Sequence, residues 1–157
     1  MQVQRVITNE TCNQNCWFCS FRRPLERPGF VTKAAVHQRI AASRQPSVRE
    51  IVLTGGEPTL IRGLADLVRE AVGADSTVVL ETNGTLIDET RARELASAGL
   101  RLARVQLVAW GDEPVAEITR DPGGFAAALR GIATLASNGV EVEVTTPVVK
   151  RNLSLVR

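Results

Sequence analysis

The sequence lacks the long hydrophobic runs and the charge excess that mark membrane and nucleic-acid-binding proteins. No apolar run approaches the 18 residues that a membrane-spanning helix needs, and residues 1–5 are polar without a signal-peptide pattern. The 19 Lys and Arg residues barely exceed the 17 Asp and Glu residues, which gives a formal net charge of +2. Such a balance argues against a dedicated nucleic-acid binder. We therefore expect a cytoplasmic chain with no membrane or nucleic-acid partner.

Side chains that commonly bind metals are scarce. Only one histidine is present, His37, and the three cysteines are the closely spaced Cys12, Cys16 and Cys19. An odd number of cysteines does not make a closed disulfide set, and without an export signal we expect reduced thiols. Structural zinc normally needs four protein ligands. Because His37 lies well beyond the cysteines in a helical pattern, a closed zinc site fits poorly. Three merely buried thiols also fit poorly, since buried cysteines do not usually cluster in this way.

The chain has the length and hydrophobic content of one globular domain, with 157 residues and 44% hydrophobic residues. Short β-branched runs alternate with amphipathic stretches, which predicts βαβ units and a parallel sheet. Five strands are expected, at residues 3–7, 51–53, 77–80, 102–109 and 140–144. We predict one α/β domain over residues 1–157: a partial (β/α) barrel of the TIM type with about five βα units and four helices. An open doubly wound sheet is the alternative.

Capping residues mark several helix ends in the sequence. Thr32 and Asp88 each precede a helical pattern and are expected to accept a hydrogen bond from its first turn. Gly73, Gly99 and Gly139 stand just past three of the helical patterns. At these positions a left-handed backbone commonly closes a helix.

Three cysteines follow the first predicted strand with the spacing C-x3-C-x2-C, at Cys12, Cys16 and Cys19. Three thiolates on one short loop can wrap a compact inorganic core. Iron–sulfur clusters are usually held by four cysteines. Three ligands would leave one iron open, and a small chelating molecule could bind there.

This run, with the aromatic Phe18 just before the last cysteine, resembles the signature of the radical S-adenosylmethionine (radical SAM) superfamily. The resemblance implies that Cys12, Cys16 and Cys19 ligate three irons of a 4Fe–4S cluster, whose fourth iron is chelated by S-adenosylmethionine. It also implies that one electron cleaves this cofactor to a 5′-deoxyadenosyl radical, which abstracts a substrate hydrogen. The alternative is a non-catalytic Fe–S module that transfers electrons or binds a partner.

Two further segments strengthen the resemblance. Gly55 and Gly56 follow the second predicted strand, where a glycine pair lets backbone approach a ligand, and the Glu57 carboxylate can accept bonds from an ammonium group. This segment is similar to the family's GGE element, which implies that it holds the amino group of the methionine moiety. Thr82 and Asn83 follow the third predicted strand and match a segment that faces the cofactor in the family.

The fourth predicted strand departs from the family pattern. Many relatives carry a Ser-x-Asp pair there that contacts the ribose of the cofactor, whereas this sequence has Val108 and Trp110 at those two positions. Neither side chain is a suitable ribose acceptor. Arg120, further along, matches an Arg that relatives of the peptide-modifying type place near the methionine carboxylate. A guanidinium fork suits that group, although an exposed loop arginine is the plainer interpretation.

The partners are indicated only in outline. Arg22, Arg23 and Arg27 could receive an acidic reductase such as a flavodoxin or ferredoxin, or they could form a solvated loop. The substrate is a peptide or a small molecule, with a slight lean towards peptide or protein modification.

The family's barrels usually continue to a sixth strand, but this sequence stops just beyond the fifth. We therefore expect a core domain that is incomplete at its C-terminus. A further segment of the same protein, or a partner chain, would supply the missing strand beside the open edge.

Overall fold

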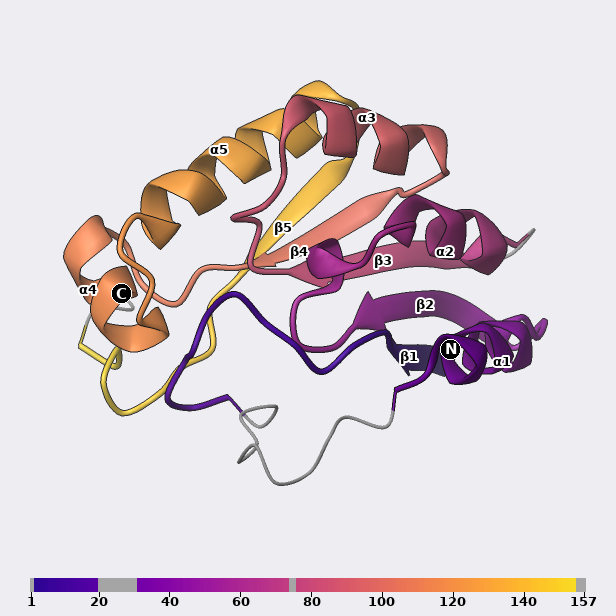
Figure 1. The fold of residues 1–157 in the computed structure, drawn as a ribbon, viewed down its shortest axis with the longest axis horizontal. Coiled ribbons are helices and arrows are strands. Elements are labelled where there is room, and N and C mark those ends of the chain that lie inside the picture. Colours follow the sequence, from indigo (N-terminus) through magenta and orange to yellow (C-terminus); the bar gives the residue numbers. More distant parts are fainter. Residues whose placement is uncertain (1, 20–30, 74–75, 155–157) are drawn as a thin grey trace.

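The computed structural model of the protein describes residues 2–19, 31–73 and 76–154, which form an α/β fold (Figure 1). Its strands are β1 (Gln2–Ile7), β2 (Val48–Thr54), β3 (Thr77–Thr82), β4 (Leu102–Gln106) and β5 (Glu141–Thr145). Its helices are α1 (Lys33–Ser43), α2 (Leu64–Ala71), α3 (Glu89–Ser97), α4 (Asp112–Thr119) and α5 (Gly124–Ser137), with a short 3-10 turn, η1, at Pro58–Leu60.

One parallel sheet with the strand order β1-β2-β3-β4-β5 organises these elements. The helices α1, α2, α3 and α5 are arrayed along one side of the curved sheet (Figure 1). Within the described residues the sheet does not close, because each pairing joins strands that are neighbours in sequence. This open, partly curved sheet agrees with the predicted partial barrel. No helix in the described ranges is long and apolar enough to span a membrane.

The hydrophobic core has two parts. The larger one fills the space between the sheet and its helices, and Ile40, Leu53, Leu80 and Leu135 are completely buried in it. The smaller one gathers Leu107, Val108, Ala109, Val115, Ile118, Phe125 and Ala128 from the β4–α4 segment, α4 and α5. Trp17 and Phe18 pack against this smaller cluster, so it supports the segment that carries the cysteines.

Strand alternation leaves polar residues on the other side of the sheet. In β2, Ile51 and Leu53 are fully buried, while Glu50 and Thr54 keep partial exposure. The register places Glu81 beside Arg104, and Arg104 beside Glu143. Because side chains alternate between faces, one face of the sheet packs on helices, and the other carries these polar side chains together with the buried Val52 and Val79.

The helix caps are confirmed in part. The hydroxyl of Thr32 accepts from the backbone N–H of Ala35 at 3.1 Å, and Asp88 accepts from that of Arg91 at 2.7 Å. Gly99 and Gly139 adopt left-handed conformations with φ of 98° and 80°. The prediction for Gly73 was wrong. The helix α2 ends earlier, at Ala71, and Val72 follows it in an extended conformation.

The end of one strand and the number of helices differ from the prediction. Strand β4 ends at Gln106 and not at Ala109, because Leu107–Ala109 leave the sheet and bury their side chains in the smaller core cluster. The apolar run therefore continues while the strand does not. Helix α4 was not predicted, so the part of the chain that the structure describes has five α-helices where four were expected. The expected basic cluster of Arg22, Arg23 and Arg27 lies outside the described residues.

Candidate functional site

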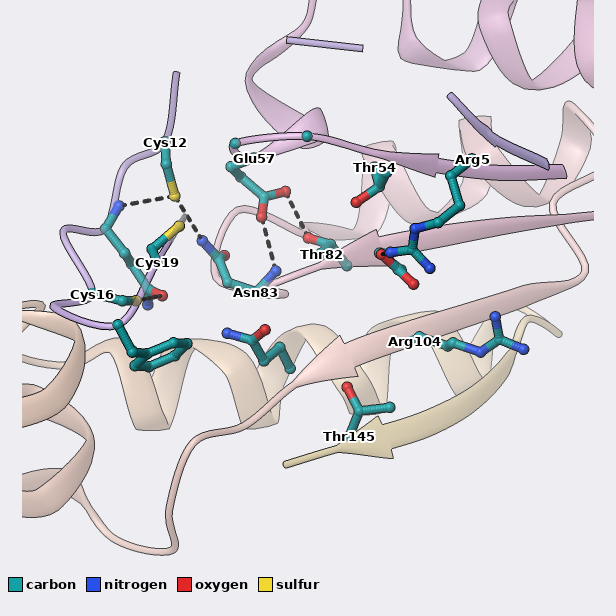
Figure 2. A pocket seen from close by; sticks show the side chains of 16 residues that line it. Arg5, Cys12, Cys16, Cys19, Thr54, Glu57, Thr82, Asn83, Arg104 and Thr145 are labelled. Atoms are coloured by element: carbon teal, nitrogen blue, oxygen red, sulfur yellow. Dashed lines mark hydrogen bonds and ion pairs between the residues drawn. The ribbon is translucent and has the colours of Figure 1, made fainter. Parts of the chain in front are cut away.

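The carboxyl ends of the strands surround a cavity of about 460 Å³ (Figure 2). Nine of the sequence-predicted site residues line it: Cys12, Cys16, Cys19, Phe18, Gly55, Gly56, Glu57, Thr82 and Asn83. Arg120 is exposed and does not line it. The structure thus brings together Cys12 and Asn83, which lie 71 residues apart in sequence. They meet at the edge where parallel α/β folds place their ligands.

The three thiols lie on one segment, residues 8–19, which we call the cysteine loop. All three cysteines are free, with Cys12 exposed, Cys16 buried and Cys19 in between. Desolvation by the surrounding loops raises the pKa of Cys12, although the Gln14 N–H and the Asn83 amide act in the opposite direction. Burial, and then the charges of Cys12 and Cys19, raise the pKa of Cys16 to about 11. Metal ligation must therefore displace protons from these thiols.

Gly55 and Gly56 are needed for a close approach of the chain to itself. The N–H of Gly56 donates to the carbonyl of Asn9 at 2.9 Å, and the N–H of Glu57 donates to that of Thr11 at 2.7 Å. A Cβ added at Gly55 would clash with the Asn9 carbonyl, and one added at Gly56 would clash with that of Thr11. The glycine pair was predicted to admit a ligand. In the structure it admits the backbone that leads into Cys12.

Glu57 is buried, with 1% of its surface exposed, and its carboxylate joins two loops. Its Oε1 accepts from Thr59 N–H at 3.0 Å and from the hydroxyls of Thr59 and Thr82 at 2.5 and 2.6 Å. Its Oε2 accepts from Asn83 N–H at 2.8 Å. A carboxylate offers about four acceptor positions. These internal bonds therefore occupy most of the capacity that was predicted to serve an ammonium group.

Asn83 carries this network on to the cysteine loop. Its Nδ2 donates to Asn13 Oδ1 at 2.9 Å and lies 3.9 Å from Cys12 Sγ (Figure 2). Asn13 in turn donates to the Thr85 hydroxyl at 2.8 Å. A chain of hydrogen bonds thus runs from Glu57 through Asn83 to Cys12. Asn13 and Thr85 were not identified from the sequence, because single Asn and Thr residues in loops carry no distinctive spacing.

A second set of contacts holds the Cys16 side of the cysteine loop. Asn15 N–H donates to the Thr119 carbonyl at 2.9 Å, and Gln14 Nε2 donates to Asp121 Oδ2 at 2.9 Å. Arg120 lies between these two anchors in a left-handed conformation with φ of 56°. Its neighbours Thr119 and Asp121 bind the cysteine loop directly, and the cofactor role of Arg120 stays a prediction.

The segment that follows β5 packs behind the cysteine loop. Asn152 is fully buried, donates to the carbonyls of Val108 at 2.6 Å and Pro147 at 2.8 Å, and accepts from Val149 N–H at 2.7 Å. This fold-back places the Arg151 guanidinium over the ring of Trp17, 5.3 Å from its centroid. The segment was not predicted, because it has neither helical nor strand periodicity.

Val108 and Trp110, which stand at the family's ribose-contact positions, do not line the cavity. Val108 is buried in the smaller core cluster, and Trp110 is 74% exposed beside Phe125. The cavity is instead lined by Arg104 and Gln106, the alternate residues of β4. Gln106 is the polar side chain at the carboxyl end of this strand. The period-two alternation across Arg104 and Gln106 would have identified it if the strand end had been placed correctly.

Charged side chains from all five strands form a band on the polar face of the sheet, which we call the charged belt: Arg5, Glu50, Glu81, Arg104 and Glu143. Arg5 pairs with Glu81. Arg104 donates to both Glu50 oxygens, at 2.6 and 3.0 Å, and to Glu143 at 2.8 Å. The Arg104 guanidinium holds the pKa of Glu50 below its usual value. Arg5, Glu81 and Arg104 line the cavity, which therefore has thiols at one end and paired charges at the other (Figure 2).

The donor set fits a cluster better than one metal ion. No group of three or more His, Cys, Asp or Glu side chains in the described ranges is arranged to hold a single ion. In a 4Fe–4S cluster each cysteine binds a different iron, so three sulfurs on a loop around a cavity suit such a group. The fit rests on three free thiols facing one space and on the room that this space offers.

Comparison with known proteins agrees with this chemistry. Among curated proteins, the chain is 31% identical over 153 residues to a probable GTP 3′,8-cyclase of Pyrobaculum aerophilum, covering 96% of this chain and 49% of that protein. It is also 31% identical over 148 residues to an AdoMet-dependent heme synthase of Oleidesulfovibrio alaskensis, covering 91% and 37%. The chain thus spans about half or less of the length of these relatives.

Solved structures share the fold at low sequence identity. Native anSMEcpe with bound AdoMet has a TM-score of 0.69 at 22% identity, covering 92% of this chain and 43% of that one. Streptococcus suis SuiB bound to precursor peptide SuiA has a TM-score of 0.79 at 15% identity, covering 98% and 34%. A family profile described as the radical SAM superfamily matches residues 6–154. On this match across nearly the whole chain, the protein belongs to the radical SAM superfamily.

Proposed function

We propose that Cys12, Cys16 and Cys19 hold three irons of the family's 4Fe–4S cluster, and that S-adenosylmethionine binds in the cavity beside it. When bound and reduced, these groups supply a 5′-deoxyadenosyl radical that removes a hydrogen atom from the substrate. The observation that carries this proposal is the shared cavity: three free thiols and the loops after β2 and β3 face one space. The chain itself positions the thiols through Asn83 and Asp121 and borders the cofactor with Gln106 and Phe18.

The test is anaerobic reconstitution followed by addition of dithionite and S-adenosylmethionine. We expect about four irons per chain and formation of 5′-deoxyadenosine on chromatography. Alanine variants of Cys12, Cys16 and Cys19 should each lose the iron and the brown colour. A variant that still bound four irons would remove that cysteine from the ligand set.

The alternative function is an Fe–S module that transfers electrons without cleaving the cofactor. The end of β4 favours this alternative, because Gln106 and the buried Val108 leave no carboxylate there to bind a ribose. The same experiment separates the two. A protein with a full cluster that yields no 5′-deoxyadenosine would be such a module, and the physiological one-electron donor, a flavodoxin or ferredoxin, would then be its redox partner.

For the substrate, we propose a small polar molecule. Two curated relatives at 31% identity are named for a nucleotide cyclase and a heme synthase, whereas the neighbours bound to peptides share 15%, 21% and 22% identity. The charged belt adds a physical reason. An apolar group that covered Arg5, Glu81 and Arg104 would remove water from these charges and offer no hydrogen bonds in its place. The test adds GTP, ATP or an unrelated peptide to the reconstituted protein. Faster formation of 5′-deoxyadenosine with GTP alone supports the proposal, and acceleration by the peptide alone overturns it.

A further inference from the structure

Gln14 presents the two ends of its amide to different partners. Its Nε2 donates to Asp121 Oδ2 at 2.9 Å, and its Oε1 lies 3.8 Å from Cys16 Sγ. Asp121 comes from the loop between α4 and α5, far from the cysteine loop in sequence. The amide therefore links this distant loop to one of the three sulfurs.

The carboxylate of Asp121 determines which way the amide points. An ionised carboxylate can only accept hydrogen bonds, so only the NH2 end of Gln14 can satisfy it. The carbonyl end is then left facing Cys16. Gly124 keeps this arrangement possible, because a Cβ there would lie 2.7 Å from Asp121 Oδ2 and 3.2 Å from Gln14 Nε2.

The surroundings of Cys12 are different. The backbone N–H of Gln14 lies 3.4 Å from Cys12 Sγ, and Asn83 Nδ2 lies 3.9 Å from the same sulfur, so both groups offer it a proton. When Cys16 is a thiolate ligand it has no proton to give to Gln14 Oε1. An oxygen then faces a negatively charged sulfur, and the amide proton that could have bound this sulfur is held by Asp121.

Hydrogen bonds to the ligating sulfurs are one of the factors that set the reduction potential of an iron–sulfur cluster. An N–H that points at a sulfur stabilises the added electron, while a carbonyl oxygen opposes it. We propose that Asp121 is a positioning residue that holds Gln14 with its N–H away from Cys16 and thereby lowers the reduction potential of the cluster. This inference rests on the proposed cluster.

The test is a redox titration of the reconstituted cluster, followed by electron paramagnetic resonance, in Asp121→Asn and in the wild type. Asparagine no longer dictates the orientation of the amide, so Gln14 can turn its N–H to Cys16. We expect about tenfold more reduced cluster at a fixed solution potential, equivalent to about 59 mV for one electron. Asp66→Asn, which removes an exposed carboxylate from α2, is the matched control and should leave the potential unchanged.

A double-mutant cycle separates positioning from a direct effect of charge. In a Gln14→Leu background, Asp121→Asn should change the ratio of reduced to oxidised cluster less than about threefold, because the amide through which Asp121 acts is gone. An equal shift in both backgrounds, or no shift in the single variant, would overturn the proposal. Gly124→Ala keeps every charge while crowding Asp121, and it should raise the potential as well. A lowered or unchanged potential in that variant would also contradict the proposal.

Iron and sulfide content, measured on every sample, separates this inference from the proposed function. Failure of the wild type to bind a cluster would overturn the proposed function, whereas a full cluster with an unmoved potential would overturn the role of Asp121 alone. If Asp121→Asn does not retain its cluster, the reduction potential of Gly124→Ala decides the role of Asp121: a raised potential supports it, and a lowered or unchanged one overturns it.

Discussion

On its Cys12 side the cysteine loop is held by the loops after β2 and β3, whereas on its Cys16 side it is held by residues from much later in the chain. The first side uses a network around the buried Glu57 and Asn83, which offers protons to the sulfur of Cys12. The second side uses Asp121 and the segment after β5 that contains Asn152. On this side Gln14 Oε1, an acceptor, faces the sulfur of Cys16. The two sides thus give sulfurs of one loop different electrostatic surroundings, so the three ligands are not equivalent.

The largest effect is expected from breaking the Cys12 side at Gly56. In Gly56→Ala the added Cβ would clash with the Thr11 carbonyl, one residue before Cys12, so the backbone of the loop must move. We expect loss of nearly all reconstituted iron and a loss of stability of about 3 kcal/mol or more. Gly73→Ala is the control, because among the described residues its Cβ would meet only the Ser76 hydroxyl, at 3.2 Å. Normal iron content in Gly56→Ala would mean that the loop is less constrained than its contacts indicate.

The next effect is expected from Glu57→Gln, which keeps the shape of the side chain and removes its charge. One carboxylate oxygen becomes an NH2 group that faces hydrogen-bond donors, so buried groups lose their partner. We expect the free energy of unfolding of the apoprotein to fall by about 3 kcal/mol, measured by urea denaturation. The exposed Glu94→Gln is the control. An unchanged denaturation midpoint would contradict a structural role and restore the interpretation of Glu57 as a pure cofactor ligand.

A smaller effect is expected on the opposite side from Asn152→Ala. The variant leaves the carbonyls of Val108 and Pro147 without their donor and frees the segment that supports Trp17. We expect a loss of about 1–3 kcal/mol in unfolding free energy, with a cluster that still forms but bleaches faster in air. Ser154→Ala, an exposed change in the same segment, should do neither. Equal air sensitivity in the two variants would show that the fold-back does not protect the cysteine loop.

The smallest effect is expected from Arg120→Gly, which changes one residue on the Cys16 side and leaves the contacts of its neighbours in place. Glycine accepts the left-handed backbone at this position at no steric cost, so the apoprotein should gain about 1 kcal/mol in stability while the bonds of Thr119 and Asp121 persist. Calorimetric titration of the same variant with S-adenosylmethionine tests the role that the family resemblance implies for the side chain. Unchanged affinity would remove Arg120 from the cofactor site, as its exposed position indicates.

The two sides also differ in how far the sequence predicts them. The cysteines, the glycine pair and Asn83 follow strand ends with distinctive spacing, so their gathering around one cavity was predictable. The partners of Glu57 were not, because which oxygen meets which hydroxyl depends on how two loops fold against each other. Asp121 and Asn152 come from loops without periodicity.

The boundary of β4 was misplaced for a physical reason. Its apolar run passes from the sheet into a second core without a change of pattern, so the strand was extended to Ala109, and Gln106 was not recognised as a cavity residue. A hydrophobic run indicates burial, but it does not say against which neighbours the side chains are buried.

The charged belt also bears on how accurately the strands pair. Because successive side chains of a strand point to opposite faces, sliding any one strand by a single residue would drive its charge into the layer beneath the helices. In β4, such a slip would exchange Arg104 for Val105 and bury a guanidinium away from Glu50 and Glu143. Each shifted strand therefore destabilises the sheet by burying a charge. Beyond its contact with any ligand, the charged belt therefore helps to specify the register of the strands.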